Sequence, residues 1–332
     1  MDPHLPTPCP DELGYSILCR HAEAWHHCED YGLWQAWTGD EASHRQLIEV
    51  VAGCRHLAPH AYPSAADPQR NFVRNHTLVP YFAAFMRSLQ RESAVSELQS
   101  SSPSASRSLA GLTRPSTVSQ RLRFCPECVA RQIRRQGFAY WTRSAQLPGL
   151  SACPAHGCTF VCTDVGVKMR SQRDRLRPLD GSVVASKQRL SLPLMSRRLE
   201  ARVAVRSLTA LRVGLGRGEA VSVDYYRRQL FAVGYGNRRV ELRTSAFVDD
   251  FHRWLHRNRA QPEGFGPSRW WLRLVTHIGG PTLPLHHILL REFLAVAKRE
   301  YDAMQPSLPG LLTNKARACG SMSAWELSSQ ES

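Results

Sequence analysis

Apolar side chains recur every three to four residues in several stretches of this chain, a spacing typical of amphipathic helices. The clearest early case places Val79, Phe82, Phe85, Met86 and Leu89 on one face. Before it, Asp11 and Glu12 would occupy the first turn of another helix, where acidic side chains suit the helix dipole. The stretches with a helical pattern are 11–20, 43–57, 76–91, 193–213, 222–233, 244–257 and 269–300. The sequence therefore predicts a mainly α fold.

A group of cysteines interrupts this pattern between residues 121 and 162. Cys125 and Cys128 form one Cys-x-x-Cys pair, and Cys153 and His156 form a Cys-x-x-His pair. Each spacing lets one tight turn present two donors to the same ion, and two such turns complete a tetrahedral zinc site. Because four protein ligands leave no position for water, we expect one structural Zn²⁺.

The residues around the two pairs add detail to this hypothesis. Pro126 and Pro154 lie inside the pairs, where they favour turns over helices. Residues 129–152 separate the pairs, so this insertion must carry structure of its own. Cys158 and Cys162 could replace a ligand, form half of another site or belong to the core, and we rank them as second-choice ligands. Ordinary buried cysteines are the alternative to a metal site.

The charge balance of the chain indicates a polyanionic partner. Lysine and arginine number 43 against 28 aspartates and glutamates, which gives a net charge of +15. We find no basic amphipathic helix with a clean apolar face, so nucleic acid is a better partner than a membrane surface. The candidate nucleic-acid contacts are Arg131, Arg134, Arg135 and Arg143 in the insertion, and Arg227, Arg228, Arg238 and Arg239 further on.

The arginines of the insertion alternate with Phe138, Tyr140 and Trp141. Arginine interleaved with aromatic residues suits phosphate contacts and base stacking. We expect Tyr140 and Trp141 to form a small core and the arginines to face solvent or DNA.

Composition then divides the chain into modules. Serine-rich residues 92–118 have little to bury and read as a linker. The predicted helices at 222–233 and 244–257 flank a glycine-containing turn, which is compatible with a DNA-binding helix-turn-helix but is also common in other helical folds. The expected modules are an N-terminal helical, helix-turn-helix-like domain over 1–91, the linker over 92–118, a zinc-ribbon-type module over 119–163, a basic connection over 164–192, a C-terminal helical domain over 193–302 and a disordered tail over 303–332.

Several classes of protein are disfavoured. The acidic, proline-rich start does not resemble a signal peptide, and no apolar run approaches bilayer length, so we expect a cytoplasmic protein with reduced cysteines. The carboxylates are few and scattered, and neither a Walker A loop nor a Ser/His/Asp arrangement is visible. The sequence therefore predicts a DNA-associated protein that is not an enzyme.

Four stretches carry a family resemblance. They are Pro8-x-Pro10-Asp11-Glu12-Leu13 with Ser16 and Arg20; His76-Thr77-Leu78-x-Pro80-Tyr81; the metal pairs with Gly137, Tyr140-Trp141-x-Arg143 and Gln146-Leu147-Pro148-Gly149; and Pro284-Leu285-His286-His287-Ile288-Leu289-Leu290 with Phe293-Leu294. With these motifs the chain resembles the TniQ/TnsD family of transposon target-selection proteins. It departs at Ala145, where family members usually have histidine, and at Tyr15-Ser16-Ile17, where they usually have a Ser-Trp pattern. Members often add a further downstream cysteine pair, which the spacing of Cys158 and Cys162 does not match, so the resemblance does not support a second zinc ion.

The resemblance implies a function that spacing alone does not. Such proteins choose an insertion site by binding DNA or an RNA-guided CRISPR effector of the Cascade type, and they recruit an AAA+ ATPase of the TnsC/TniB type. Members bound to effectors work as homodimers. The resemblance thus implies a non-catalytic target-selection protein. The alternatives are a zinc-containing DNA-binding transcription regulator and, from another class, a metal-dependent nuclease or recombinase subunit.

Overall fold

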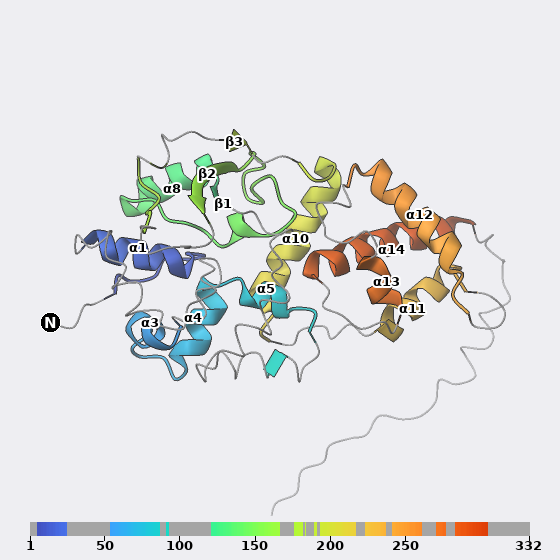
Figure 1. The fold of residues 1–332 in the computed structure, drawn as a ribbon, viewed down its shortest axis with the longest axis horizontal. Helices are drawn as coiled ribbons and strands as arrows, with labels where there is room; N and C mark the ends of the chain where they lie inside the picture. Colours follow the sequence, from blue (N-terminus) through green and yellow to red (C-terminus); the bar gives the residue numbers. More distant parts are fainter. Residues whose placement is uncertain are drawn as a thin grey trace, which may run out of the picture.

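The structure is a computed structural model, and it describes residues 5–24, 54–86, 91–92, 121–166, 176–181, 183, 189–190, 193–216, 223–236, 241–260, 270–276 and 283–304. Within these residues the fold is mainly helical, with one small antiparallel sheet at the edge of the molecule (Figure 1). The prediction of a mainly α fold is confirmed. Among the described helices, none is both long enough and apolar enough to cross a bilayer.

The first helix begins later than the sequence predicts. α1 spans Gly14–Ala24, so Asp11 and Glu12 precede it, and Asp11 has a left-handed backbone with φ of 60°. The buried Glu12 carboxylate accepts a hydrogen bond of 2.8 Å from the Cys9 N–H and pairs with Arg20 at 2.8 Å. The prediction for this acidic pair is therefore wrong, because long-range partners hold it in the arm that leads into α1.

The predicted helix at 76–91 is confirmed only in part. α4 spans Pro68–His76 and ends there, the chain is extended at Thr77 (φ −127°, ψ 169°), and α5 spans only Val79–Ala83. Pro80 lies in the first turn of α5, the position where proline favours the start of a helix. α3 spans Cys54–Ala61, and the earlier part of the predicted helix at 43–57 lies outside the described residues.

A three-stranded sheet forms the frame of the cysteine-rich segment. β1 spans Arg121–Phe124, β2 spans Val161–Gly166 and β3 spans Arg189–Leu190, in the order β1-β2-β3 with antiparallel neighbours. After β1 comes α8, Pro126–Gln136, and a short 3-10 helix covers Ser144–Gln146. The insertion thus carries its own structure, as expected from its length.

The C-terminal half is a group of helices. They are α10 (Arg197–Val213), α11 (Val223–Ala232), α12 (Thr244–Arg257), α13 (Trp270–Val275) and α14 (Pro284–Met304). The first three agree with the predicted stretches, whereas the single predicted stretch at 269–300 contains two helices. Figure 1 shows α10 in the centre, between the sheet and the remaining C-terminal helices.

Trp141 joins the cysteine-rich segment to the first helix. Its side chain is fully buried, and Tyr140 is also buried, as predicted. The Trp141 N–H donates to the Ser16 hydroxyl (3.1 Å), and its carbonyl accepts from the Leu13 N–H (2.8 Å). The indole N–H donates to the Arg177 carbonyl at 3.0 Å. Trp141 therefore belongs to a core that continues from the N-terminal helices, not to a separate small core.

The end of α10 lies very close to α5. A Cβ placed on Gly214 would be 1.7 Å from the carbonyl oxygen of Pro80, which is backbone and cannot rotate away. We expect Gly214→Ala to lower the free energy of unfolding by about 2 kcal/mol, because overpacking of this kind typically costs that much. Gly216→Ala is the matched control, since its Cβ would meet only the Val213 carbonyl at 3.3 Å. Equal urea midpoints for the two variants would contradict the close approach of the two helices.

Candidate metal centre

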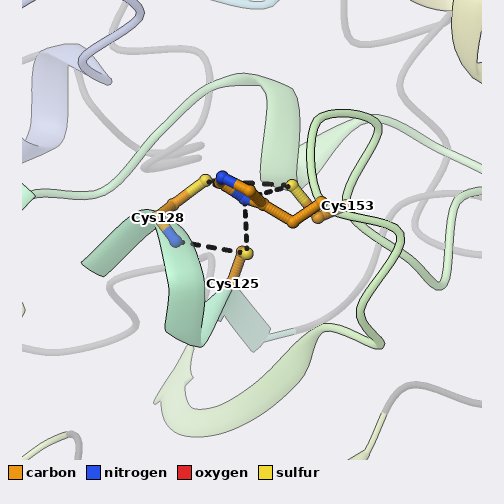
Figure 2. Close-up of side chains that lie close together, drawn as sticks. Cys125, Cys128 and Cys153 are labelled. Carbon is orange, nitrogen blue, oxygen red and sulfur yellow. Dashed lines mark hydrogen bonds between the residues drawn. The ribbon is translucent and has the colours of Figure 1, made fainter. Parts of the chain in front are cut away.

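The pairing of β1 with β2 brings the two predicted ligand pairs together. Phe124, the last residue of β1, pairs with Val161, the first residue of β2. Cys125 follows β1 directly, and the second ligand pair precedes β2. Figure 2 shows the side chains of Cys125 and Cys128 from the start of α8 converging with Cys153 from the facing loop.

Cys125 caps the helix that it introduces. Its backbone is extended (φ −103°, ψ 122°), and its sulfur accepts a hydrogen bond of 3.3 Å from the Cys128 N–H. Pro126 is the first residue of α8, where its missing N–H costs nothing. The expectation of a turn without helix at Pro126 is therefore wrong. The helix N-terminus also favours negative charge on the capping sulfur.

The second pair lies in a hairpin turn. The Cys153 N–H donates to the Cys158 carbonyl (2.8 Å), and the Gly157 N–H donates to the Cys153 carbonyl (2.7 Å). Gly157 has φ of 67°, a conformation that favours glycine. Pro154 lies in this turn, as predicted. The turn presents Cys153 and His156 on the side that faces α8.

Four predicted ligands form one cluster. The donor atoms of Cys125, Cys128, Cys153 and His156 all lie within 4.8 Å of one another. The His156 Nδ1 atom is 3.4 Å from the sulfurs of Cys125 and Cys128 and 3.6 Å from that of Cys153, and the sulfurs of Cys128 and Cys153 are 3.8 Å apart. A tetrahedron with bonds of about 2.3 Å to sulfur and about 2.0 Å to nitrogen has edges of roughly 3.5 to 3.8 Å. Both the donor types and the spacing fit a tetrahedral metal ion.

The electrostatic setting of the thiols differs across the cluster. Hydrogen bonding from Cys128, together with the N–H groups of Ala155 and His156, lowers the pKa of Cys153 to about 4, although burial opposes this effect. Burial raises the pKa of Cys125 to about 12. Because a metal binds thiolates, a cation here would offset the cost of ionising the buried sulfurs.

The two second-choice ligands occupy different places. The Cys158 sulfur lies 3.1 Å from that of Cys125 but is not one of the four clustered donors. Cys162 lies in β2, where it pairs with Arg123 of β1. The four-residue cluster is therefore the better candidate set.

Glu200 supports the second ligand pair from a distant helix. Its carboxylate is buried and accepts hydrogen bonds from the Ser151 hydroxyl (2.8 Å) and from the N–H groups of Ser151 and Ala152. These residues lead directly into Cys153. The sequence analysis missed this role, although a glutamate between Leu199 and Val203 on the buried face of α10 was a usable signal.

Gln146 and Arg123 fix the rest of the insertion against β1. The Gln146 amide exchanges two hydrogen bonds with the Arg123 backbone, at 3.1 and 2.8 Å. The buried Arg123 guanidinium donates to the carbonyls of Leu147 (3.0 Å) and Leu150. The sequence pattern marked Gln146 but gave no sign that Arg123 is buried.

Arg143 does not face solvent or DNA, so that prediction is wrong. Arg143 is only 7% exposed, and its guanidinium donates hydrogen bonds to the carbonyls of Arg74 (2.7 Å) and Thr77 (3.2 Å). It also pairs with Asp11 at 3.2 Å. Arg143 therefore joins the insertion to the N-terminal helices.

The other candidate arginines differ in exposure. Arg131, Arg134 and Arg135 are exposed on α8, while Arg228 is exposed and Arg227 partly exposed on α11. Arg238 and Arg239 lie outside the described residues. Among the candidate arginines that the structure describes, the three on α8 thus form the largest exposed group on one helix.

Comparison with known proteins identifies the class to which this arrangement belongs. Residues 3–160, which include the whole Cys/His cluster, match the TniQ family. These residues, slightly less than half of the chain, match a TniQ domain, and this match supports the resemblance to the TniQ/TnsD family. The chain is also 30% identical over 168 residues to an Escherichia coli protein described as "Transposon Tn7 transposition protein TnsD". That match covers 46% of this chain and only 30% of the relative.

Proposed function

We propose that this chain is a non-catalytic target-selection protein for transposition, which binds target DNA or an RNA-guided CRISPR effector and recruits an AAA+ ATPase of the TnsC/TniB type. The match of residues 3–160 to the TniQ family is the observation that carries this proposal. The description of the Escherichia coli relative as a transposition protein supports it.

The cluster of Cys125, Cys128, Cys153 and His156 would hold one structural Zn²⁺ in a zinc-ribbon-type module. Three thiolates and an imidazole are a donor set that zinc prefers, and a site with four protein ligands leaves no position for catalytic water. A bound ion would tie the start of α8 to the hairpin that contains Cys153. This support for a structural role comes from the donor set and from the two separate segments, a helix start and a turn, that carry the donors.

The exposed arginines would supply contacts to nucleic acid. Arg131, Arg134 and Arg135 project from one short helix whose first turn carries two of the proposed ligands, so a bound ion would hold their backbone in place. Arg227 and Arg228 lie on α11, the first helix of the proposed C-terminal helix-turn-helix formed with α12.

The buried carboxylates support a protein without catalytic activity. Glu12 binds Arg20, Glu200 binds backbone N–H groups before Cys153, and Glu292 pairs with Arg202. Each of these carboxylates is engaged by donors of the chain itself. Metal-dependent phosphodiester chemistry needs carboxylates grouped around a shared ion, and these three each serve a separate structural contact.

A pull-down with the purified full-length chain tests the proposed function. The bait is tagged protein, and the prey is the AAA+ ATPase encoded with the transposase of the same element, with ATP present. We expect retention of the ATPase to rise when duplex target DNA or the CRISPR effector complex is added, and the two arms separate direct from guided targeting. Specific duplex binding without ATPase in any arm would instead favour a transcription regulator. Divalent-metal-dependent cleavage of the duplex, abolished by replacing one carboxylate, would show an enzyme.

A further inference from the structure

An open groove lies between α10 and α14, with the end of α5 closing one side. Its volume is about 690 Å³. α10 contributes most of its wall, and Figure 1 shows α10 and α14 meeting in the middle of the molecule. Apart from Ala84 and Phe85, the described lining lies outside residues 3–160, so the groove belongs mainly to the part of the chain that the family match leaves unassigned.

One wall of the groove is an exposed apolar stripe. Val205, Thr209 and Val213 are four residues apart on α10, and the two valines are 66% and 50% exposed. The Thr209 hydroxyl donates to the Val205 carbonyl at 2.9 Å, so its hydrogen-bonding capacity is directed to the helix backbone. Exposed valine weakens a helix relative to alanine and contributes nothing to this core. Two exposed valines beside a groove that is also lined by Ala84, Ala201 and Ile288 make this surface a candidate interaction site.

Positive charge borders the same stripe. Arg202 and Arg206, with side chains 43% and 42% exposed, both pair with the nearly buried Glu292. The Arg202–Glu292 ion pair has a length of 2.6 Å. Because two guanidinium groups share one carboxylate, the rim has a net positive charge. A second carboxylate from a partner would complement it, since guanidinium groups bind carboxylates through several donors.

We propose that this groove binds a short amphipathic helix of a partner protein, with apolar side chains one turn apart and an acidic residue beside them. The lining from Ala201 to Val213 runs about 18 Å at 1.5 Å per residue, which matches a partner helix of about three turns. Nucleic acid is a poorer occupant, because the valine side chains have neither a charge nor a hydrogen-bond donor for a phosphate backbone. A second copy is poorer as well, because the chain carries a net charge of +15.

A displayed library of 14-residue peptides tests the groove on the full-length chain. Peptides are selected on the wild type alone, and the affinity of each recovered peptide is then measured on the wild type and on Val205→Asp. We expect the recovered peptides to contain an apolar pair one turn apart with Asp or Glu nearby. Their affinity should fall at least about ten-fold in Val205→Asp, where a buried charge would replace an apolar contact. Arg206→Gln should weaken binding of the acidic peptides and reduce its salt dependence.

Ile133→Asp is the matched control, because Ile133 is similarly exposed at 51% but lies on α8. It should leave peptide binding unchanged. Val213→Asp repeats the test at the other end of the stripe, and near-ultraviolet circular dichroism checks that each variant folds. This readout contains neither ATPase nor DNA, so its result does not depend on the proposed function.

Three results would overturn the proposal. In the first, the recovered peptides bind wild type and Val205→Asp equally well. In the second, Val205→Asp converts a dimer to a monomer in sedimentation, which would show that a second copy fills the groove. In the third, Val205→Asp weakens duplex DNA binding while Met304→Asp, at an exposed position at the end of α14 outside the groove lining, does not, which would show a nucleic-acid groove.

Discussion

Cys153→Ser is expected to release bound metal and to lower the free energy of unfolding by about 4 kcal/mol. Serine offers a poor donor in place of the thiolate that hydrogen bonds prepare in this turn. A thousand-fold excess of metal over its dissociation constant corresponds to about 4 kcal/mol of stabilisation. At roughly 2–4 °C per kcal/mol for chains of comparable size, the thermal midpoint should fall by about 10 °C. Elemental analysis and a thermal melt measure the two effects together.

Cys162→Ser is the matched control, because Cys162 lies in the same module but outside the four-donor cluster. It should keep both metal and midpoint. Cys158→Ser tests the neighbouring thiol, whose sulfur is 3.1 Å from that of Cys125. Loss of metal in Cys158→Ser but not in Cys153→Ser would show that the ligand assignment is wrong. A chelator should lower the midpoint of the wild type and leave that of Cys153→Ser unchanged.

The candidate ligands could be found from sequence because their geometry is local. A Cys-x-x-Cys or Cys-x-x-His spacing fixes two donors within one turn, and one pair of strands then suffices to bring the turns together. The same local logic failed at Pro126. Proline is common both in turns and at the first position of a helix, so Pro126 alone predicts either. The Cys125 sulfur caps the N-terminus of α8 and thereby favours the helix.

Long-range contacts explain the remaining errors. The sequence pattern predicts Glu12 in the first turn of a helix. In the structure its carboxylate instead binds the Cys9 N–H and the Arg20 guanidinium. The register of apolar positions across 76–91 looks continuous, although Thr77 is extended between two helices. Glu200 acts on residues about fifty positions earlier. Periodicity describes one segment at a time, and these roles depend on which segments meet.

Arg143→Gln is expected to cost about 3 kcal/mol of stability while leaving the duplex affinity of the folded protein unchanged. Removing one partner of a buried charged network typically costs that much. The Arg143 guanidinium binds the carbonyls of Arg74 and Thr77, which would then be left without these donors, and it pairs with Asp11. Burial lowers the pKa of Arg143, and Asp11 counteracts this shift by stabilising the charged form. Urea unfolding measures the loss.

The paired variant Arg134→Gln with Arg135→Gln should have the opposite effect. Both side chains are exposed on α8, so the urea midpoint should change little. If they bind phosphates, duplex affinity falls, and the slope of log affinity against log salt becomes shallower by roughly 2, about 0.9 for each phosphate that is no longer neutralised. The comparison separates an arginine that holds two parts of the fold together from arginines that bind nucleic acid. A duplex affinity lowered by Arg143→Gln in fully folded protein, with an unchanged slope for the α8 pair, would contradict both assignments.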